Sequence, residues 1–597
     1  MKKIIVAEKC LSQKIQQAIV ALHNQSVDAA LLQLQKTRKD YAGDYTLVTF
    51  PLAKVLHSAP EKLANEIGEW LKNNWEEVLG FNIVKGFLNI ELSAHFWLQQ
   101  LQTLSENKNE DVLSANGKTV MVEYSSPNTN KPLHLGHIRN NLLGYSVAQI
   151  LQAAGNKVIK VNLVNDRGIH ICKSMLAWQR WGNGETPQSS GKKGDHLVGD
   201  YYVRFDQEYK KQIAELTAQG KSEDDAKKQA PLILEAQAML QKWEQGDAQV
   251  KQLWTMMNGW VYEGFAATYK ALGVDFDKTY YESNTYLLGK GLVAEGLQKG
   301  VFFKKDDGSV WIDLTADGLD QKLVQRSDGT SVYITQDIGT AVQRFGEHQL
   351  NAHIYVVGNE QNYHFQVLKL ILAKLGYDWS GSIQHLSYGM VELPEGKMKS
   401  REGTVVDADD LVQQMLDTAR EMAQELGKLE GLSEVEKDSV IRTVGLGALK
   451  YYILKVDPQK TMLFNPKESI DFNGNTGPFI QYTHARICSV LRRAADEHLL
   501  AAIPQEAALS PKELSLIQQL DDFGNVLQQA ASALSPALIA NYVYELAKEF
   551  NQFYHDFSIL KEENLVLKQF RLALSAQIAA TVKTAMSLMG IDVPERM

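Results

Sequence analysis

Thr119-Val120-Met121-Val122-Glu123-Tyr124 is an apolar run that predicts a β-strand. It leads through Ser126-Pro127-Asn128-Thr129-Asn130-Lys131-Pro132-Leu133-His134-Leu135-Gly136-His137 into residues 138–151. Leucine, isoleucine and valine recur there at helical spacing, which predicts a helix: Leu142, Leu143, Val147, Ile150 and Leu151. In open parallel sheets, nucleotides bind where a strand gives way to a helix, beside the free N–H groups of that helix. The stretch therefore predicts a nucleotide-binding α/β domain.

The tetrapeptide His134-Leu135-Gly136-His137 has chemistry that suits such a ligand. Gly136 has no Cβ, so a base or a phosphate can approach its backbone closely. His134 and His137 can donate hydrogen bonds to phosphate oxygens. Two surface or capping histidines explain the tetrapeptide alone equally well. Its place between a strand and a helix favours the functional interpretation.

The length and net charge of the chain limit which classes of protein are possible. A chain of 597 residues is long enough for about three to five domains. Its net charge of −9 argues against broad, non-specific nucleic-acid binding, although local basic faces can still bind a structured RNA. The three cysteines, Cys10, Cys172 and Cys488, form no C-x-x-C pair, so neither a disulfide framework nor a cysteine-rich zinc site is expected.

The location of the protein follows from what the chain lacks. The apolar start of the chain is broken by Glu8 and Lys9, so no signal peptide is expected. No stretch is long and apolar enough to cross a membrane, and scattered thiols fit a reducing compartment. We expect a cytoplasmic monomer without a membrane partner.

The pattern along the chain predicts an α/β fold in several parts. They are a small N-terminal α/β domain at 1–115, a Rossmann-like parallel-sheet catalytic domain at 116–405 with a helical insertion at about 182–250, a helical connection at 406–472, and a C-terminal all-α helical bundle at 473–597. Within the catalytic domain, further strands are expected at 157–165, 332–335, 354–357 and 386–391, with a helix at 365–375. No strand is expected beyond about residue 405.

A second motif, Glu395-Gly396-Lys397-Met398-Lys399-Ser400-Arg401-Glu402-Gly403-Thr404, follows the last of these strands. Two glycines bracket a compact group of positive charges, and such a loop can neutralise charge on a transferring phosphoryl group. An ordinary basic turn explains this loop in isolation. The two motifs occur in order, each after a strand, at opposite ends of one α/β region, and together they favour a function.

The pair resembles the H-I-G-H and K-M-S-K-S signatures of class I aminoacyl-tRNA synthetases. Longer segments of the sequence are similar to the arginyl-tRNA synthetase family. These segments are residues 123–128, 130–139, 194–196, 336–337, 358–361, 477–486 and 594–597. The resemblance is strong over the catalytic region and the C-terminal domain. It is looser over 1–115, where the family carries an added tRNA-contacting domain. One departure is that Lys399 and Ser400 are transposed relative to the family's loop.

The resemblance implies a two-step reaction. The carboxylate of L-arginine attacks the α-phosphorus of ATP and releases pyrophosphate, and the 3′-terminal adenosine of tRNA(Arg) then attacks the adenylate and releases AMP. The protein positions the reactants and stabilises developing charge. Mg²⁺ accompanies ATP and is held mainly by phosphates, so no metal-binding side chains are assigned. The implied catalytic residues are His134, His137, Lys131 and Lys397, and the implied ATP-binding residues are His134, Gly136, His137, Lys397, Met398 and Lys399.

An arginine substrate requires fixed carboxylates, because its guanidinium is planar and always charged. By resemblance, Glu123, Tyr333 and Asp337 hold the guanidinium, while Asn128 and Gln361 hold the α-amino and carboxylate end. Glu123 and Asp337 are expected at the ends of strands, where ligands bind in this architecture. For any one of the 71 acidic residues, a structural cap or a surface ion pair is the usual explanation.

The tRNA surface is less clear from the sequence. Arg486, Arg492 and Arg493 lie on a predicted helix at the start of the C-terminal bundle, and Tyr542 belongs to an aromatic-rich stretch further on. Arginines and stacking aromatic rings suit unpaired anticodon bases. Aromatic residues at helical spacing are more often part of a core. The resemblance favours an anticodon-binding domain.

Other classes of protein share some of these features. Another class I synthetase would share the signatures, although cysteinyl specificity would require a zinc site that the cysteine spacing denies. A small adenylyltransferase would not need so large a C-terminal helical domain. A catalytically inactive relative that only binds RNA would be favoured by degraded signatures, whereas both histidines, Gly136 and Lys397 are intact.

Overall fold

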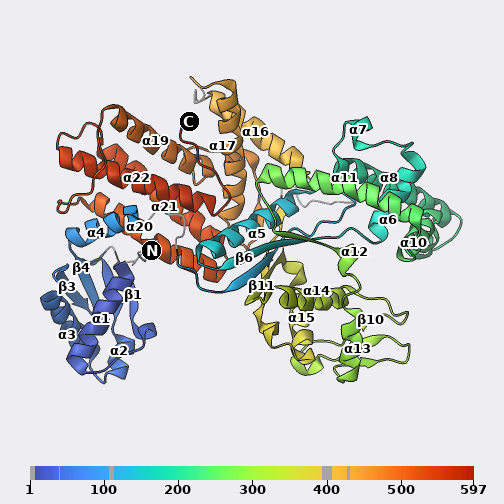
Figure 1. Cartoon of the computed structure of the whole chain (residues 1–597), viewed down its shortest axis with the longest axis horizontal. Helices are drawn as coiled ribbons and strands as arrows, with labels where there is room; N and C mark the ends of the chain where they lie inside the picture. Colours follow the sequence, from blue (N-terminus) through green and yellow to red (C-terminus); the bar gives the residue numbers. More distant parts are fainter. Residues whose placement is uncertain (1–6, 39, 107–112, 393–405, 426–430) are drawn as a thin grey trace.

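The computed structural model describes residues 7–38, 40–106, 113–392, 406–425 and 431–597 (Figure 1). Its centre is a parallel five-stranded sheet in the order β12-β11-β5-β6-β7. The strands are β5 (Thr119–Glu123), β6 (Lys157–Val164), β7 (Lys278–Tyr281), β11 (Ala352–Gly358) and β12 (Ile383–Tyr388). Val120, Met121 and Val122 in the central strand are buried, as expected where helices cover both faces of a sheet. The predicted Rossmann-like fold is confirmed.

Helix α5 (Leu135–Ala153) follows β5, and α15 (Asn362–Leu375) connects β11 to β12, as predicted. The predicted strand at 332–335 is wrong, because these residues lead into helix α14 (Tyr333–His348). Val-Tyr-Ile-Thr has the composition of a strand, but the following apolar residues recur at helical spacing. Ile334, Ile338, Ala341 and Phe345 are buried along one face of α14.

Several short strands escaped prediction. The segment between β7 and α14 contains α12 (Glu282–Thr285), α13 (Lys290–Gln298) and a three-stranded antiparallel sheet of β8 (Phe302–Lys304), β9 (Val310–Ile312) and β10 (Lys322–Gln325). A parallel pair, β13 (Val391–Glu392) and β14 (Met462–Leu463), lies elsewhere. The expectation that strands stop near residue 405 is therefore wrong at β14. Two or three residues are too few for an alternating pattern to be recognised.

The helical insertion leaves the sheet after β6 and returns at β7, on the right of Figure 1. Its helices are α6 (Ile169–Trp181), α7 (Pro187–Ser190), α8 (Gly194–Ala218), α9 (Glu223–Gln229), α10 (Pro231–Glu244) and α11 (Ala248–Leu272). Glycines permit close packing between α8 and α11. A Cβ on Gly194 would lie 2.2 Å from the carbonyl oxygen of Trp260, and one on Gly264 would lie 2.4 Å from Asp195 Oδ1.

The N-terminal domain, in blue in Figure 1, is an antiparallel sheet with helices. The strand order is β1-β2-β4-β3. Its elements are α1 (Ala7–His23), β1 (Gln33–Lys36), β2 (Tyr45–Val48), α2 (Phe50–Val55), α3 (Pro60–Asn74), β3 (Val78–Val84), β4 (Phe87–Leu92) and α4 (Ala94–Glu106). The predicted small α/β domain is thus present at the start of the chain.

The C-terminal part is helical, as predicted. Its helices are α16 (Ala408–Glu425), α17 (Glu434–Leu454), α18 (Pro466–Ser469), α19 (Gly477–Asp496), α20 (Pro511–Ala533), α21 (Pro536–Asp556) and α22 (Leu565–Ser587). Helix α5 of the catalytic domain packs against α16, α17, α20 and α21. In the described parts of the chain, no helix has the length and apolarity that a membrane crossing demands.

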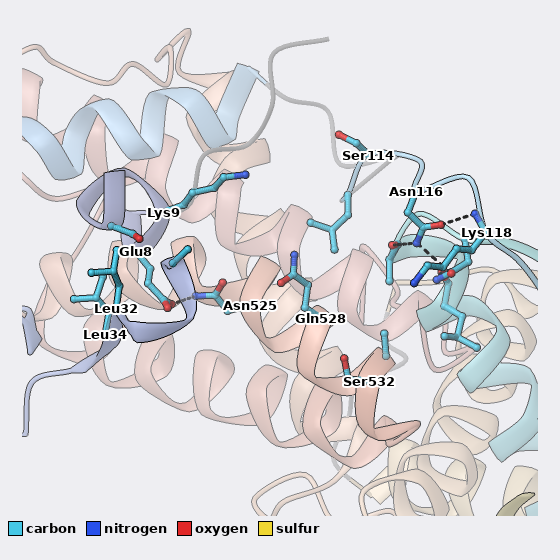
Figure 2. A pocket seen from close by; sticks show the side chains of 17 residues that line it. Glu8, Lys9, Leu32, Leu34, Ser114, Asn116, Lys118, Asn525, Gln528 and Ser532 are labelled. Carbon is cyan, nitrogen blue, oxygen red and sulfur yellow. Dashed lines mark hydrogen bonds between the residues drawn. The ribbon is translucent and has the colours of Figure 1, made fainter. Parts of the chain in front are cut away.

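A cavity of about 900 Å³ lies between the N-terminal domain, the segment before β5 and helix α20 (Figure 2). Asn525 Nδ2 donates to Glu8 Oε2 at 2.8 Å on one side, and Asn116 and Lys118 line the other side. Asn116 and Lys118 precede β5, and Asn156 precedes β6. The cavity therefore lies toward the amino ends of these strands, away from the edge where the nucleotide motif lies.

Candidate active site

His134 and His137 cap the start of helix α5 reciprocally. The Nδ1 atom of His134 accepts the N–H of Gly136, and the Nδ1 atom of His137 accepts the N–H of His134, each at 3.1 Å. Side-chain acceptors at a helix start satisfy backbone donors that have no partner within the helix. Because both Nδ1 atoms accept, both rings carry their proton on Nε2 when neutral. The Nε2–H group of each histidine can therefore donate to a ligand.

Burial and neighbouring charge keep these histidines neutral. Burial, together with the ammonium of Lys131, lowers the pKa of His134 to about 4. Burial, His134 and Lys131 lower the pKa of His137 well below its ordinary value. Burial also lowers the pKa of Lys131. A Cβ on Gly136 would lie 3.0 Å from Cε1 of His134, so this glycine makes room for the capping ring.

The segments that flank 393–405 are both attached to the start of α5. Leu135 N donates to Val406 O at 3.1 Å, and Ala408 N donates to Leu133 O at 2.9 Å. On the other side, the buried guanidinium of Arg139 donates to the carbonyl oxygens of Met390 (3.0 Å), Pro458 (3.2 Å) and Lys460 (2.8 Å). The predicted site residues Lys397, Met398 and Lys399 lie outside the described residues.

Glu123 lies at the carboxyl end of β5, as predicted, and is buried. Its carboxylate pairs with the guanidinium of Arg344 on α14, and His353 Nε2 lies 3.9 Å from it. Burial raises the pKa of Glu123, Arg344 opposes that shift, and Asp337 adds to it. Arg344 is a partner that the sequence did not suggest. The role of Glu123 toward a substrate stays a prediction.

Tyr333 and Asp337 lie one turn apart at the start of α14, and the tyrosine ring is exposed. Asp337 Oδ2 lies 2.6 Å from His364 Nε2 on α15. Gln361 follows β11 at the end of a short 3-10 helix and is exposed, as is Asn128 after β5. Asn128 also forms a parallel bridge with Asn165, which follows β6. These residues occupy the carboxyl edge of the sheet, although Asp337 reaches it from a helix rather than from a strand.

Glu282 was missed by the sequence reasoning. It begins α12 directly after β7, and burial raises its pKa to about 7, with Arg167 opposing and the charges of Asp166 and Asp337 adding to the effect. The charge of Asp337 raises the pKa of both Glu282 and Glu123, so these three acids lie close together at one edge of the sheet. An acid after a strand is a recognisable signal, but β7 is a four-residue polar and aromatic strand that was not predicted. Such a group of acids favours a cationic ligand.

The predicted tRNA-binding arginines do converge. Arg486, Arg492 and Arg493 line a pocket of about 460 Å³ with Tyr482, Tyr554 and Arg596. The guanidinium of Arg486 lies 4.8 Å from the ring centre of Tyr482 and 5.6 Å from that of Tyr554. Basic groups between aromatic rings are suited to unpaired bases.

Tyr542 does not join these arginines. Its ring stacks on Phe523, with the ring centres 5.3 Å apart, and its hydroxyl donates to the carbonyl oxygen of Gln519 at 2.9 Å. It therefore packs between helices α20 and α21. Tyr554, from the same aromatic stretch, lies at the pocket instead.

Comparisons with known families match this architecture. Residues 99–465 match the family described as tRNA synthetases class I (R), catalytic domain. Residues 480–597 match the DALR anticodon binding domain, and residues 9–92 match the Arginyl tRNA synthetase N terminal domain. The parallel sheet, the capped histidine motif and the first of these matches define a class I aminoacyl-tRNA synthetase.

Similar proteins narrow the assignment within that class. The arginine–tRNA ligase of Bacteroides fragilis is 62% identical, over 97% of this chain and 97% of that protein. The arginine–tRNA ligase of Parabacteroides distasonis is 58% identical, over 98% of this chain and 100% of that protein. The solved Thermus thermophilus arginyl-tRNA synthetase superposes with a TM-score of 0.80 at 26% identity, over 99% of this chain and 100% of that one. The chain therefore belongs to the arginine–tRNA ligase family, whose members are enzymes that use ATP, arginine and tRNA.

Proposed function

We propose that this chain joins L-arginine to the 3′-terminal adenosine of tRNA(Arg) in two steps at the carboxyl edge of the five-stranded sheet. The observation that supports this most is the pairing of two unlike surfaces at that edge. Neutral histidine donors, Lys131 and the start of a helix suit phosphates on one side. Acids that suit a guanidinium gather on the other side.

For ATP, the proposed ligands are the Nε2–H groups of His134 and His137, with the ammonium of Lys131. Lys397, Met398 and Lys399 are proposed to complete the set. His134, His137 and Lys131 are themselves neutral or positive, so these three side chains fit phosphate oxygens rather than a metal ion. We therefore expect Mg²⁺ to be held by the phosphates, whose charge it neutralises. Donors of this kind stabilise the charge that develops as pyrophosphate leaves.

For arginine, we propose that Asp337 and Glu282 hold the guanidinium, with Glu123 and the exposed ring of Tyr333 nearby. Asn128 and Gln361 hold the amino-acid end, whose carboxylate attacks the α-phosphorus. In the second step, the terminal hydroxyl of the tRNA attacks the carbonyl carbon of the adenylate, and AMP leaves. The protein contributes placement and charge to both steps.

For tRNA, we propose contacts from two ends of the chain. Residues 1–115 act as the added tRNA-contacting domain, and residues 473–597 bind the anticodon through Arg486, Arg492 and Arg493. Residues 116–405 and 406–472 serve as the catalytic domain and the helical connection. We further propose that the enzyme is a monomer and acts in the cytoplasm, where its substrates are found.

The decisive experiment is aminoacylation of total tRNA with each of the twenty labelled amino acids. We expect arginine alone to be attached. Charging of a different amino acid would identify another class I synthetase. Tight tRNA binding without any charging would identify an RNA-binding relative that has lost catalysis.

A further inference from the structure

Lys193, at the start of helix α8, lies in a cluster of charged side chains that has no role in the scheme above. Its ammonium donates to Asp195 Oδ2 (3.1 Å), Thr268 Oγ1 (2.5 Å) and Asp409 Oδ2 (2.5 Å). These acceptors come from its own segment, from α11 and from α16. An ammonium has three donors, so Lys193 joins three separate segments with all of them.

His196 adds a second basic group to the cluster. Its Nε2 atom lies 3.0 Å from Asp409 Oδ2 and 3.5 Å from Asp407 Oδ2. The hydrogen bond to Asp409 raises the pKa of His196. Burial alone would raise the pKa of Asp409, but the hydrogen bonds from His196 and Lys193 outweigh burial and hold that pKa well below its ordinary value. Asp409 is therefore ionised and bound from two sides.

The geometry of the cluster suits a cation, and Lys193 supplies one. Asp195, His196 and Asp409 have ligand atoms within 4.8 Å of one another. The ammonium of Lys193 contacts both of these carboxylates. The cluster is therefore an internal network of ion pairs that joins α8, α11 and α16.

The cluster borders the turn that carries Lys131 and His134. Asp407 forms an antiparallel bridge with His134, and its Oδ1 atom accepts the N–H of Asp409 at 2.8 Å. Helix α8 touches the same turn directly, since a Cβ on Gly199 would lie 2.9 Å from Cδ of Pro132 and 3.6 Å from Cα of Lys131. The start of α8 thus contacts the turn both directly and through the residues that begin α16.

We propose that Lys193 and His196 are positioning residues for ATP, which hold Asp407 and Asp409 against the turn so that His134 and Lys131 face the phosphates. The proposal rests on the ATP-binding role proposed above for His134 and Lys131. Without Lys193, the carboxyl groups of Asp195, Asp407 and Asp409 have His196 as the basic group that remains in this cluster. Their repulsion then displaces the segment that pairs with His134.

The first test compares Lys193→Met with Lys192→Met. Lys192 is the adjacent lysine, and its ammonium pairs with the exposed Asp200 at 2.6 Å, so it is a matched control. A misplacement of catalytic groups by 1 Å costs about 10²-fold in rate. We expect Lys193→Met to lower kcat/KM for ATP in aminoacylation by about 10- to 100-fold, with the KM for tRNA little changed. Lys192→Met should behave as the unaltered enzyme.

The second test is the pH profile of His196→Gln, which keeps a donor but cannot be charged. The charged groups that act on His196 are Asp409, Asp407 and Asp195. Lys193 and Thr268 donate to the same Asp409 carboxylate. Because its pKa is raised, the imidazolium bond to Asp409 is present at low pH and is lost as pH rises through that pKa. The unaltered enzyme should lose kcat/KM for ATP over that range, and His196→Gln should lack this component of the profile.

The outcomes separate this inference from the proposed function. If His134→Gln leaves kcat/KM for ATP unchanged, the proposed ATP site is wrong. If His134→Gln is strongly impaired while Lys193→Met and His196→Gln match Lys192→Met, the positioning role is wrong. An equal loss of kcat/KM for ATP, arginine and tRNA together with a lower melting temperature would make the cluster a structural link only.

Lys193→Arg, which keeps the charge, should retain most activity. If Lys193→Met does not fold, the comparison of Lys193→Arg with His196→Gln tests the positioning role instead.

Discussion

The carboxylate of Glu123 and the guanidinium of Arg344 form a buried ion pair between β5 and α14, although 221 positions separate them in sequence. Removing one partner of such a pair leaves an uncompensated buried charge, which typically costs about 3–5 kcal/mol. We therefore expect Arg344→Met to lower the free energy of unfolding of the catalytic domain by about that amount, as measured by urea denaturation.

The control for this change is Lys227→Met, which removes an exposed i,i+4 pair with Glu223. Exposed pairs contribute little to stability, so the control should unfold close to the unaltered chain. If the two variants were equally stable, the Glu123–Arg344 pair would not contribute to folding.

Asp337→Asn should weaken arginine binding and leave ATP binding nearly unchanged. Loss of one charged partner of a desolvated pair costs about 2–5 kcal/mol, much of it from the charge left unpaired. Steady-state aminoacylation at varied arginine should therefore give a sharply lower kcat/KM for arginine. Asp313→Asn, at an exposed carboxylate that accepts the hydroxyl of Thr315, is the control. Equal losses for arginine and ATP would point to a folding role of Asp337, through its contact with His364.

Arginine use should depend on pH through Glu282. Burial raises the pKa of this carboxyl to about 7, so it is neutral below that pH and ionised above it. The guanidinium stays charged throughout. The kcat/KM for arginine, which reports on groups of the free enzyme, should rise as pH increases through about 7. Glu282→Gln should have a lower value and a flatter profile, and an unchanged profile in that variant would place the titration elsewhere.

Arg493→Ala should raise the KM for tRNA and make that KM less sensitive to salt. Each phosphate contact adds about 0.7 to 0.9 to the slope of log affinity against log salt. Tyr542→Phe serves as a contrast, because this tyrosine packs on Phe523 and its hydroxyl is bonded to Gln519. If Tyr542→Phe strongly raised the KM for tRNA and Arg493→Ala left it unchanged, the proposed position of the anticodon surface would be wrong.

The parts of this fold that were predictable are those with local signals. The strand at 119–123 and the helix after it have an apolar run and a helical repeat, and the turn between them carries the capping histidines. The residue pattern predicts Asp337 at the correct edge of the sheet but on the wrong element, because the β-branched residues around Ile334 look like a strand. Arg344 and Glu282 could not be placed, since their positions depend on pairing between strands that are far apart in sequence.

Lys131 should supply charge that the second motif lacks at position 400. The transposed loop has a serine there, and the described structure places Lys131 at the turn before α5, where its ammonium lowers the pKa of both His134 and His137. Removing one preorganised donor to a transition state costs roughly 10²–10³ in rate. Lys131→Ala should fall in that range for the activation step, with a smaller effect on arginine binding, when both are measured in single-turnover reactions. Adding Ser400→Lys should recover part of the loss, because it restores a positive charge at position 400.

The alternative explanation is that Lys399 takes this role and Lys131 is only a half-buried surface residue. A nearly silent Lys131→Ala beside a severely impaired Lys399→Ala would establish this alternative.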